Sequence, residues 1–308
     1  MSPIPTVKMN NGAEMPVVAM GLWTGTPGAD QTAKQVDIAI KAGYRHFDTA
    51  AMYANEKETG ECLRKCGVPR QELFVTTKVW NDRHRDVEAS FDESFEKLGL
   101  EYIDLYLLHW PQAQKADGSE DPISFVDTWK QLERLLETRA GKVRAIGVSN
   151  FSTKTLKELL EHATVVPACN QIETHPYAPD HELVDFCKAR GIVVTAYTPL
   201  GLGKPAMLED ADIVAVAKEL NAQPSQVILS WNVQRGVPVL PKTQHEDRAK
   251  KNIELVHLSD EQMNRISKIH EDPKRRGYLN TVVYNASNNS VLSWSLEKLG
   301  WPYPFYGY

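Results

Sequence analysis

A regular alternation of short apolar runs with longer amphipathic stretches constrains this chain most strongly. Between Val17 and His270, eight strand-like runs occur, and each is followed by a stretch whose apolar residues recur at helical spacing. Such alternation favours parallel strands joined by right-handed crossovers. No change of composition, linker or repeat interrupts the pattern. We therefore predict an α/β fold, a closed (β/α)8 TIM barrel rather than an open sheet.

The pattern also gives approximate bounds for each element. Strands are predicted at 17–22, 45–48, 73–79, 102–109, 143–148, 169–173, 192–197 and 238–240. Helices are predicted at 30–42, 56–66, 86–97, 124–138, 153–162, 180–189, 210–220, 224–235, 245–254 and 260–270.

Two segments lie outside this alternation. Asn11-Gly12 stands between short apolar arms and predicts a β-hairpin at about 5–16, which we expect to cover one end of the barrel. The segment 271–308 is irregular and rich in aromatic residues, so we expect a long C-terminal loop that packs on the barrel. The whole chain, 1–308, is predicted to form a single domain, with the barrel at about 17–270.

Charge and hydropathy exclude several classes of protein. The net charge is −5 and no stripe of Lys or Arg occurs, so we expect no nucleic-acid partner. No apolar run approaches eighteen residues, and the N-terminus lacks an apolar signal core, which predicts no membrane span and a cytoplasmic location. The four cysteines form no CxxC motif, so we expect reduced thiols and no metal site.

Polar residues follow almost every predicted strand. In a barrel of this kind the carboxyl ends of the strands meet at one rim, where active sites lie. Independent strands have no structural reason to bring polar groups to the same rim. The residues are Asp48, Tyr53, Lys78, His109, Ser149, Asn150, Gln171, Tyr197, Lys242 and Thr243.

Four of these residues make chemical sense together. A tyrosine is a poor proton donor at neutral pH, but an ammonium beside Tyr53 would lower its pKa, and Lys78 supplies one. Asp48 would keep Lys78 charged, and His109 would orient a carbonyl oxygen. Such a set can protonate a carbonyl as hydride reaches its carbon.

Each residue taken singly has an ordinary structural explanation. Lys78 could simply neutralise Asp48 inside the barrel, His109 could be a hydrogen-bonded core histidine, and Tyr53 could lie on the surface at a helix start. We favour a catalytic site because all four converge on one rim.

The same residues lie in segments that closely resemble the aldo-keto reductases. The resemblance runs in order from about residue 5 to 270, through GYRHFDTA, TKVW, LYLLHWP, IGVSNF, NQIETHP, AYTPLG and LPKT. It implies an (α/β)8 barrel that transfers hydride directly from a reduced nicotinamide to a carbonyl, without a metal. It also implies a catalytic tetrad of Asp48, Tyr53, Lys78 and His109, with Tyr53 as the general acid.

The resemblance further implies a cofactor site on the barrel. Ser149, Asn150 and Gln171 would hold the nicotinamide carboxamide, and Tyr197 would stack on its ring. Basic and hydroxyl groups at the adenosine end suit a 2′-phosphate, so NADPH/NADP+ is expected rather than NADH, although Lys242 and Arg248 could instead be a solvated helix start. The implied cofactor residues are Trp23, Asp48, Ser149, Asn150, Gln171, Tyr197, Thr198, Leu200, Lys242, Thr243, Arg248 and Asn252.

The expected substrate is a small carbonyl compound in a pocket with aromatic walls. Aromatic or aliphatic aldehydes and ketones fit such walls, and sugar aldehydes or glyceraldehyde stay open. Two rival functions also stay open: a cofactor-binding regulatory protein on a reductase scaffold, and a lyase that uses Lys78 as a Schiff base. The family resemblance implies a monomer. The expected substrate contacts are Trp23, Trp80, His109, Trp110 and Trp301.

Overall fold

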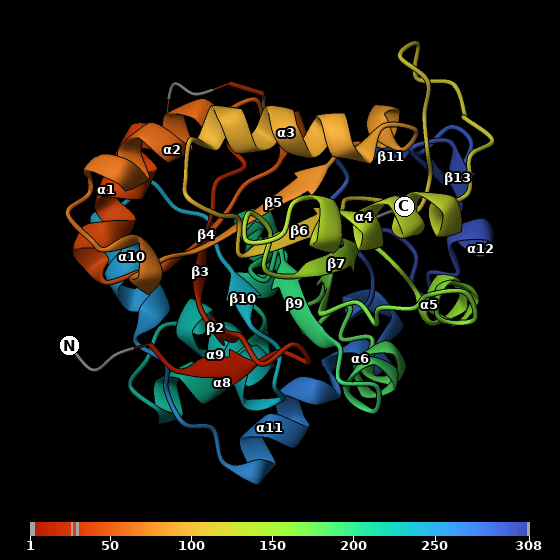
Figure 1. The fold of residues 1–308 in the computed structure, drawn as a ribbon. Helices are drawn as coiled ribbons and strands as arrows, with labels where there is room; N and C mark the ends of the chain where they lie inside the picture. Colours follow the sequence, from red (N-terminus) through yellow and green to blue (C-terminus); the bar gives the residue numbers. More distant parts are fainter. Residues whose placement is uncertain (1–3, 26, 29–30, 307–308) are drawn as a thin grey trace.

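The computed structural model, which describes residues 4–25, 27–28 and 31–306, contains a parallel sheet curled into a barrel (Figure 1). Eight strands of the described chain follow one another around it in sequence order, so every neighbour is joined by a crossover. They are β3 (Ala19–Gly21), β4 (His46–Asp48), β5 (Phe74–Val79), β6 (Leu105–Leu108), β7 (Ile146–Ser149), β8 (Cys169–Glu173), β9 (Val193–Tyr197) and β10 (Val239–Leu240).

The first and last strands of the sheet meet and close the barrel. Val18 forms a parallel bridge with Val239. The backbone N–H of Val239 donates to the oxygen of Val17 at 2.8 Å, and the backbone N–H of Gly21 donates to the oxygen of Pro241 at 3.0 Å. The prediction of a (β/α)8 barrel is confirmed.

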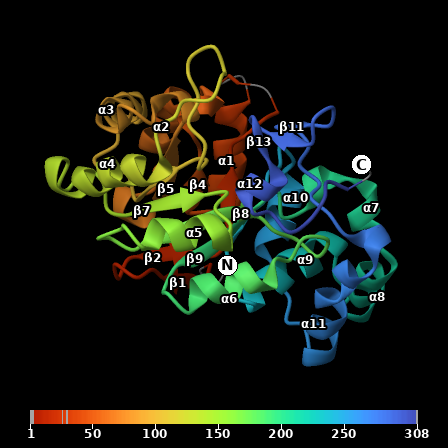
Figure 2. The same ribbon diagram turned by 90° about the vertical axis from the view of Figure 1, so that its right-hand side faces the viewer.

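Helices surround the barrel on all sides in the two views (Figures 1 and 2). Between β3 and β9 one main helix follows each strand, and further helices follow β9 and β10. They are α1 (Thr32–Ala42), α2 (Glu56–Lys65), α3 (Val87–Leu98), α4 (Phe125–Thr138), α5 (Thr153–Leu160), α6 (His181–Lys188), α7 (Pro205–Leu208), α8 (Ala211–Glu219), α9 (Pro224–Gln234), α10 (Glu246–Ile253) and α11 (Asp260–Ser267).

Most predicted bounds agree with the structure to within two residues. The predicted start of the first helix, Asp30, lies outside the described residues. The strands predicted at 102–109 and 143–148 begin three residues later than expected, because Ile103 and Val143 make an isolated bridge before the continuous ladder starts. Next to this bridge, the Asp104 carboxylate accepts from the backbone N–H of Val75 at 2.9 Å, and the Asp104 N–H donates to the Val75 oxygen at 3.1 Å.

The N-terminal hairpin closes the amino end of the barrel. Its strands β1 (Thr6–Lys8) and β2 (Glu14–Pro16) pair antiparallel around a turn that contains Gly12 at φ +87°. Asn10 donates to the oxygen of Pro167, just before β8, at 3.1 Å. Met9 and Met15 are buried among residues from the starts of the barrel strands. The predicted cover is therefore present, at the end opposite the candidate site.

The C-terminal segment is more regular than predicted. Instead of an irregular loop it forms a three-stranded antiparallel sheet and one short helix, which lie together beside the carboxyl end of the barrel (Figure 2). Packing of its aromatic residues is as expected, since Phe305 stacks on Tyr284 with ring centroids 4.0 Å apart. The elements are β11 (Tyr284–Asn285), β12 (Ser290–Val291), β13 (Trp294–Ser295) and α12 (Leu296–Leu299).

Helices α2 and α3 approach so closely at Gly60 that no side chain fits there. A Cβ atom at this position would lie 1.8 Å from the backbone oxygen of Leu98. We expect Gly60→Ala to destabilise the fold by about 1–3 kcal/mol, although alanine is the better helix former. Chemical denaturation measures this change, and Lys57→Ala on the exposed face of α2 is the matched control. An unchanged denaturation midpoint for Gly60→Ala would show that the helices separate easily.

No helix within the described part of the chain is long and apolar enough to cross a membrane. Cys62, Cys66, Cys169 and Cys187 are free thiols. Across residues 4–25, 27–28 and 31–306, His, Cys, Asp and Glu side chains form no cluster suited to a metal ion.

Candidate active site

A cavity of about 930 Å³ opens at the carboxyl ends of the barrel strands. It is lined by the ends of β3, β4, β8, β9 and β10 and by the loops that follow them, with a contribution from the C-terminal segment. This volume lies at the upper end of the range for ligand pockets. The cavity is therefore the candidate active site.

Three residues of the predicted tetrad, Asp48, Tyr53 and His109, line this cavity, and the fourth, Lys78, is fully buried in contact with Asp48. Asp48 ends β4, Tyr53 ends a short 3-10 helix, Lys78 lies on β5 and His109 follows β6. The Lys78 ammonium donates to Asp48 Oδ2 and to the backbone oxygen of Thr49, both at 2.8 Å. Its Nζ also lies 3.5 Å from the Tyr53 hydroxyl oxygen. The Tyr53 and His109 rings meet edge to face with centroids 5.9 Å apart.

The electrostatic balance at Tyr53 differs from the prediction. Burial raises the pKa of Tyr53, and the lowering by Lys78 does not fully offset it, so the net pKa lies above the ordinary value. The prediction of a lowered pKa was therefore wrong in its net sign, because it considered the neighbouring charge but not desolvation. Lys78 still acts in the predicted direction.

The pKa values of Lys78 and His109 are shifted in opposite directions. Burial lowers the pKa of Lys78, but the attraction of Asp48 and Tyr53 outweighs it and raises the pKa overall. Burial together with the charge of Lys78 holds the pKa of His109 well below its ordinary value. At neutral pH the site therefore contains a phenol, an ammonium and a neutral imidazole. Of these, the phenol is the group suited to donate a proton and then share the negative charge with Lys78.

Hydrogen bonds tie the tetrad to the predicted carboxamide residues. Gln171 Nε2 donates to Asp48 Oδ1 at 2.8 Å. Asn150 Nδ2 donates to the backbone oxygen of His109 at 2.9 Å, and its Oδ1 accepts from the Tyr197 hydroxyl at 2.8 Å. Asn150, Gln171 and Tyr197 line the cavity. Ser149 lies behind them and donates to the backbone oxygen of Gln171 at 2.8 Å.

The other end of the cavity is basic. Lys242 and Arg248 line it and, among the described residues, neither makes an ion pair. Partial burial lowers the pKa of Lys242. Unpaired cations in a cleft favour an anionic ligand. The predicted Thr198, Leu200, Thr243 and Asn252 also line this half of the cavity.

Three of the five predicted substrate contacts line the cavity, and two do not. Trp23, His109 and Trp110 line it. Trp80 lies edge-on behind His109, with ring centroids 5.0 Å apart. Trp301 packs against Trp110 at 5.7 Å between centroids.

The sequence prediction missed several lining residues. Met52, Gln223, Pro224 and Ser225 follow predicted elements closely, so a systematic search of the helix starts could have found them. Asn280, Val282 and Val283 come from the C-terminal segment, whose placement no local pattern indicates.

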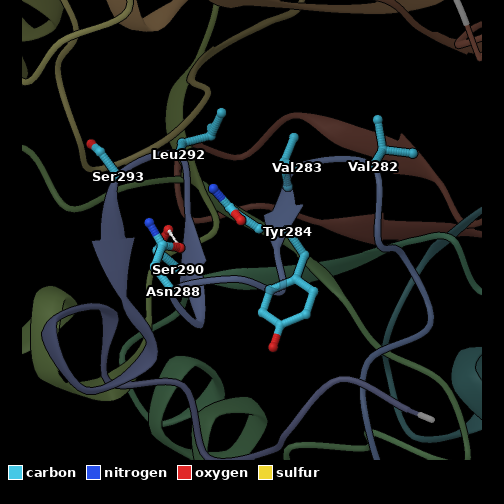
Figure 3. A pocket seen from close by; sticks show the side chains of 8 residues that line it. Val282, Val283, Tyr284, Asn288, Ser290, Leu292 and Ser293 are labelled. Atoms are coloured by element: carbon cyan, nitrogen blue, oxygen red, sulfur yellow. Dashed lines mark hydrogen bonds between the residues drawn. The ribbon is translucent and has the colours of Figure 1, made fainter. Parts of the chain in front are cut away.

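A second hollow of about 430 Å³ lies on the C-terminal segment (Figure 3). Val282 and Val283 line both this hollow and the main cavity, so the two are neighbours. The turn between β12 and β13 borders it, with Leu292 and Ser293 at φ +47° and +77°. Positive φ at both turn residues matches the twist of a tight hairpin.

The comparisons with known proteins agree with this geometry. Residues 18–271 match the model of the aldo/keto reductase family. The chain therefore belongs to this family and is an oxidoreductase.

Individual relatives are similar over most of their length. The chain is 42% identical to the glycerol 2-dehydrogenase (NADP(+)) of Saccharomyces cerevisiae, covering 86% of this chain and 91% of that one. It is 42% identical to the D-galacturonate reductase of Hypocrea jecorina, covering 90% and 94%. A Bombyx mori aldo-keto reductase solved in complex with NADP superposes with a TM-score of 0.84 at 34% identity, covering 94% and 97%.

Proposed function

We propose that this protein reduces aldehydes and ketones to alcohols, reversibly, with NADPH as the reductant and Tyr53 as the general acid. The observation that carries the proposal is the Tyr53 hydroxyl held 3.5 Å from Lys78 Nζ, which is itself paired with Asp48 at the cavity. Tyr53 would give its proton to the carbonyl oxygen, and Lys78 would stabilise the phenolate that remains.

Residues on both sides of the cavity fit a nicotinamide dinucleotide. The bound reduced nicotinamide would supply the hydride. Tyr197 offers a flat ring at the tetrad end, and Asn150 and Gln171 offer amides beside it. Lys242 and Arg248 would bind a 2′-phosphate at the other end. The name of the yeast relative and the NADP bound to the silkworm protein support NADP over NAD.

The remaining tetrad residue would orient the substrate. The neutral imidazole of His109 would hold the carbonyl oxygen next to Tyr53, while Trp23 and Trp110 would form apolar walls. Small aldehydes and ketones suit this pocket, and the relatives named for glycerol and galacturonate keep polyhydroxy aldehydes as candidate substrates.

Two rival functions are less well supported. A Schiff-base lyase needs a neutral Lys78, but Asp48 and Tyr53 raise the pKa of that amine. Borohydride with a carbonyl substrate should therefore trap no adduct on Lys78. A purely regulatory protein would not need an intact tetrad, and here all four residues converge.

The first test follows NADPH or NADH absorbance with a reactive aromatic aldehyde and with glyceraldehyde. We expect rapid loss with NADPH and slow loss with NADH. Equal rates would contradict the 2′-phosphate site, and no loss with either despite tight NADPH binding would favour a regulatory role.

The pH dependence of reduction follows from the shifted pKa values. Reduction needs protonated Tyr53, which exists below its pKa, and that pKa lies above the ordinary 10.0. The pKa of His109 lies well below 6.5, so His109 stays neutral over the same range. We expect kcat/KM to be flat between pH 7 and pH 9, since the pKa values of Tyr53 and Lys78 lie above this range and that of His109 lies below it. A decline centred near neutral pH would contradict these assignments.

We further propose that residues 1–308 act as one domain, as a cytoplasmic monomer. Four free thiols support a reducing compartment. Light scattering of the purified chain would test the monomer directly.

A further inference from the structure

A buried carboxyl group at the end of β8 holds the start of the C-terminal segment. Glu173 Oε1 accepts from the backbone N–H groups of Leu279 at 2.6 Å and Asn280 at 3.0 Å. The same oxygen lies 2.9 Å from Nε2 of His175. The side chains of Glu173 and His175 are 2% and 0% exposed. Three partners on one buried oxygen make this a specific anchor, since buried carboxyl groups are costly unless hydrogen-bonded.

The anchored backbone leads directly into the main cavity. Asn280 and Tyr197 both line the cavity. Asn280 Oδ1 accepts from the backbone N–H of Val282 at 3.2 Å. Val282 lines the cavity and borders the hollow in Figure 3. A shift of the backbone at 279–280 would therefore move the cavity-lining side chains of Asn280 and Val282.

Glu173 also lies beside a strand residue that is hydrogen-bonded towards the tetrad. Glu173 pairs with Tyr197 in the parallel register of β8 and β9. The Tyr197 hydroxyl donates to Asn150, which in turn donates to the backbone oxygen of His109. The anchor of the C-terminal segment therefore lies in register beside Tyr197, the ring on which the nicotinamide would stack.

We propose that Glu173 is a positioning residue, which fixes residues 279–280 so that Asn280 and Val282 are held at the cavity and the C-terminal segment completes the substrate pocket. This inference rests on the proposed reductase function. Glu173 does not touch substrate or cofactor itself. Its side chain joins the end of β8 to residues 279–280, two segments distant in the sequence, which the barrel alone does not require.

Three substitutions at Glu173 distinguish the contribution of the side chain's length from that of its negative charge. Glu173→Ala removes the acceptor, and Glu173→Asp keeps the charge but withdraws it by one methylene. Because each leaves buried N–H groups unpaired, we expect KM for a small aldehyde to rise about tenfold or more in both, with kcat changed less than about threefold. Glu173→Gln keeps an acceptor oxygen in place and should restore most of the loss. Amide exchange at Leu279 and Asn280 should accelerate in the first two variants while the β6 amides stay protected.

A double-mutant cycle tests whether Glu173 acts through Asn280. Asn280→Ala alone should raise KM, and adding Glu173→Ala should raise it further by less than about threefold, because the two residues share one path. Fully additive effects would overturn the proposed path. If Glu173→Ala does not fold, the Glu173→Asp variant provides the test. An unchanged KM and unchanged amide exchange at Leu279 and Asn280 in that variant would contradict the proposed role of Glu173.

The two proposals fail in different ways. A wild-type protein that reduces no carbonyl would contradict the proposed function, while the exchange of the Leu279 and Asn280 amides would still report on the anchor. An active wild type with an unchanged Glu173→Asp variant would overturn the anchor alone.

Discussion

Tyr53→Phe should lose about 10²–10⁴-fold in turnover, which is the range for removing a positioned general acid. Phenylalanine keeps the ring, so its contacts with Trp23 at 5.0 Å between centroids and with the Lys78 ammonium at 4.9 Å should persist. Only the proton donor is removed. NADPH binding, measured by quenching of tryptophan emission, should therefore stay near the wild-type value while steady-state reduction nearly disappears.

A second buried tyrosine provides the matched control. Tyr44 is fully buried, and its hydroxyl donates to the backbone oxygen of Ala249 at 3.2 Å, away from the cavity. Tyr44→Phe should cost about 1 kcal/mol of stability and leave turnover unchanged. If Tyr53→Phe kept more than about a tenth of wild-type turnover, the assignment of Tyr53 as general acid would be wrong.

The barrel could be predicted from the sequence because its determinants are local and repeat. Each strand from β3 to β10 has its own apolar run, and the order of the strands in the sheet is the order in the chain. Closure follows when Val18 meets Val239. The polar residues at the strand ends could be grouped for the same reason, since parallel strands deliver their carboxyl ends to one rim.

The C-terminal segment could not be predicted in this way. Strands β11, β12 and β13 are two residues long, too short for an alternating pattern, and they are held by contacts with the barrel. The sequence pattern therefore could not predict that Asn280 and Val282 line the cavity.

Electrostatics at Tyr53 also needed the three-dimensional structure. The sequence indicated a lysine beside the phenol, which lowers the pKa. It did not indicate how completely the hydroxyl is buried, and burial has the larger effect. The direction of a pKa shift depends on whether burial or the neighbouring charges have the larger effect, so a correct list of neighbours is not sufficient.

Lys242→Ala and Arg248→Ala should convert the preference for NADPH into near equality with NADH. Each side chain faces the cavity without an ion-pair partner among the described residues, so neither charge is already satisfied by the protein. Charge-assisted hydrogen bonds to a phosphate are strong, and losing one should raise the dissociation constant for NADPH about tenfold or more. The dissociation constant for NADH, which lacks the 2′-phosphate, should change little.

An exposed lysine of α10 serves as a control that distinguishes a direct contact with the 2′-phosphate from general electrostatic attraction of the cofactor. Lys250 is exposed on the same helix but does not line the cavity, so Lys250→Ala should change NADPH binding less than about twofold. Added salt should weaken NADPH binding to the wild type more than to the Lys242→Ala, Arg248→Ala double variant, because the variant has lost the charges that salt screens. Equal losses for NADPH and NADH would instead mean that these residues bind the diphosphate, which both cofactors share. In that case the preference for NADP would have to come from Thr243 or from another residue at the basic end of the cavity.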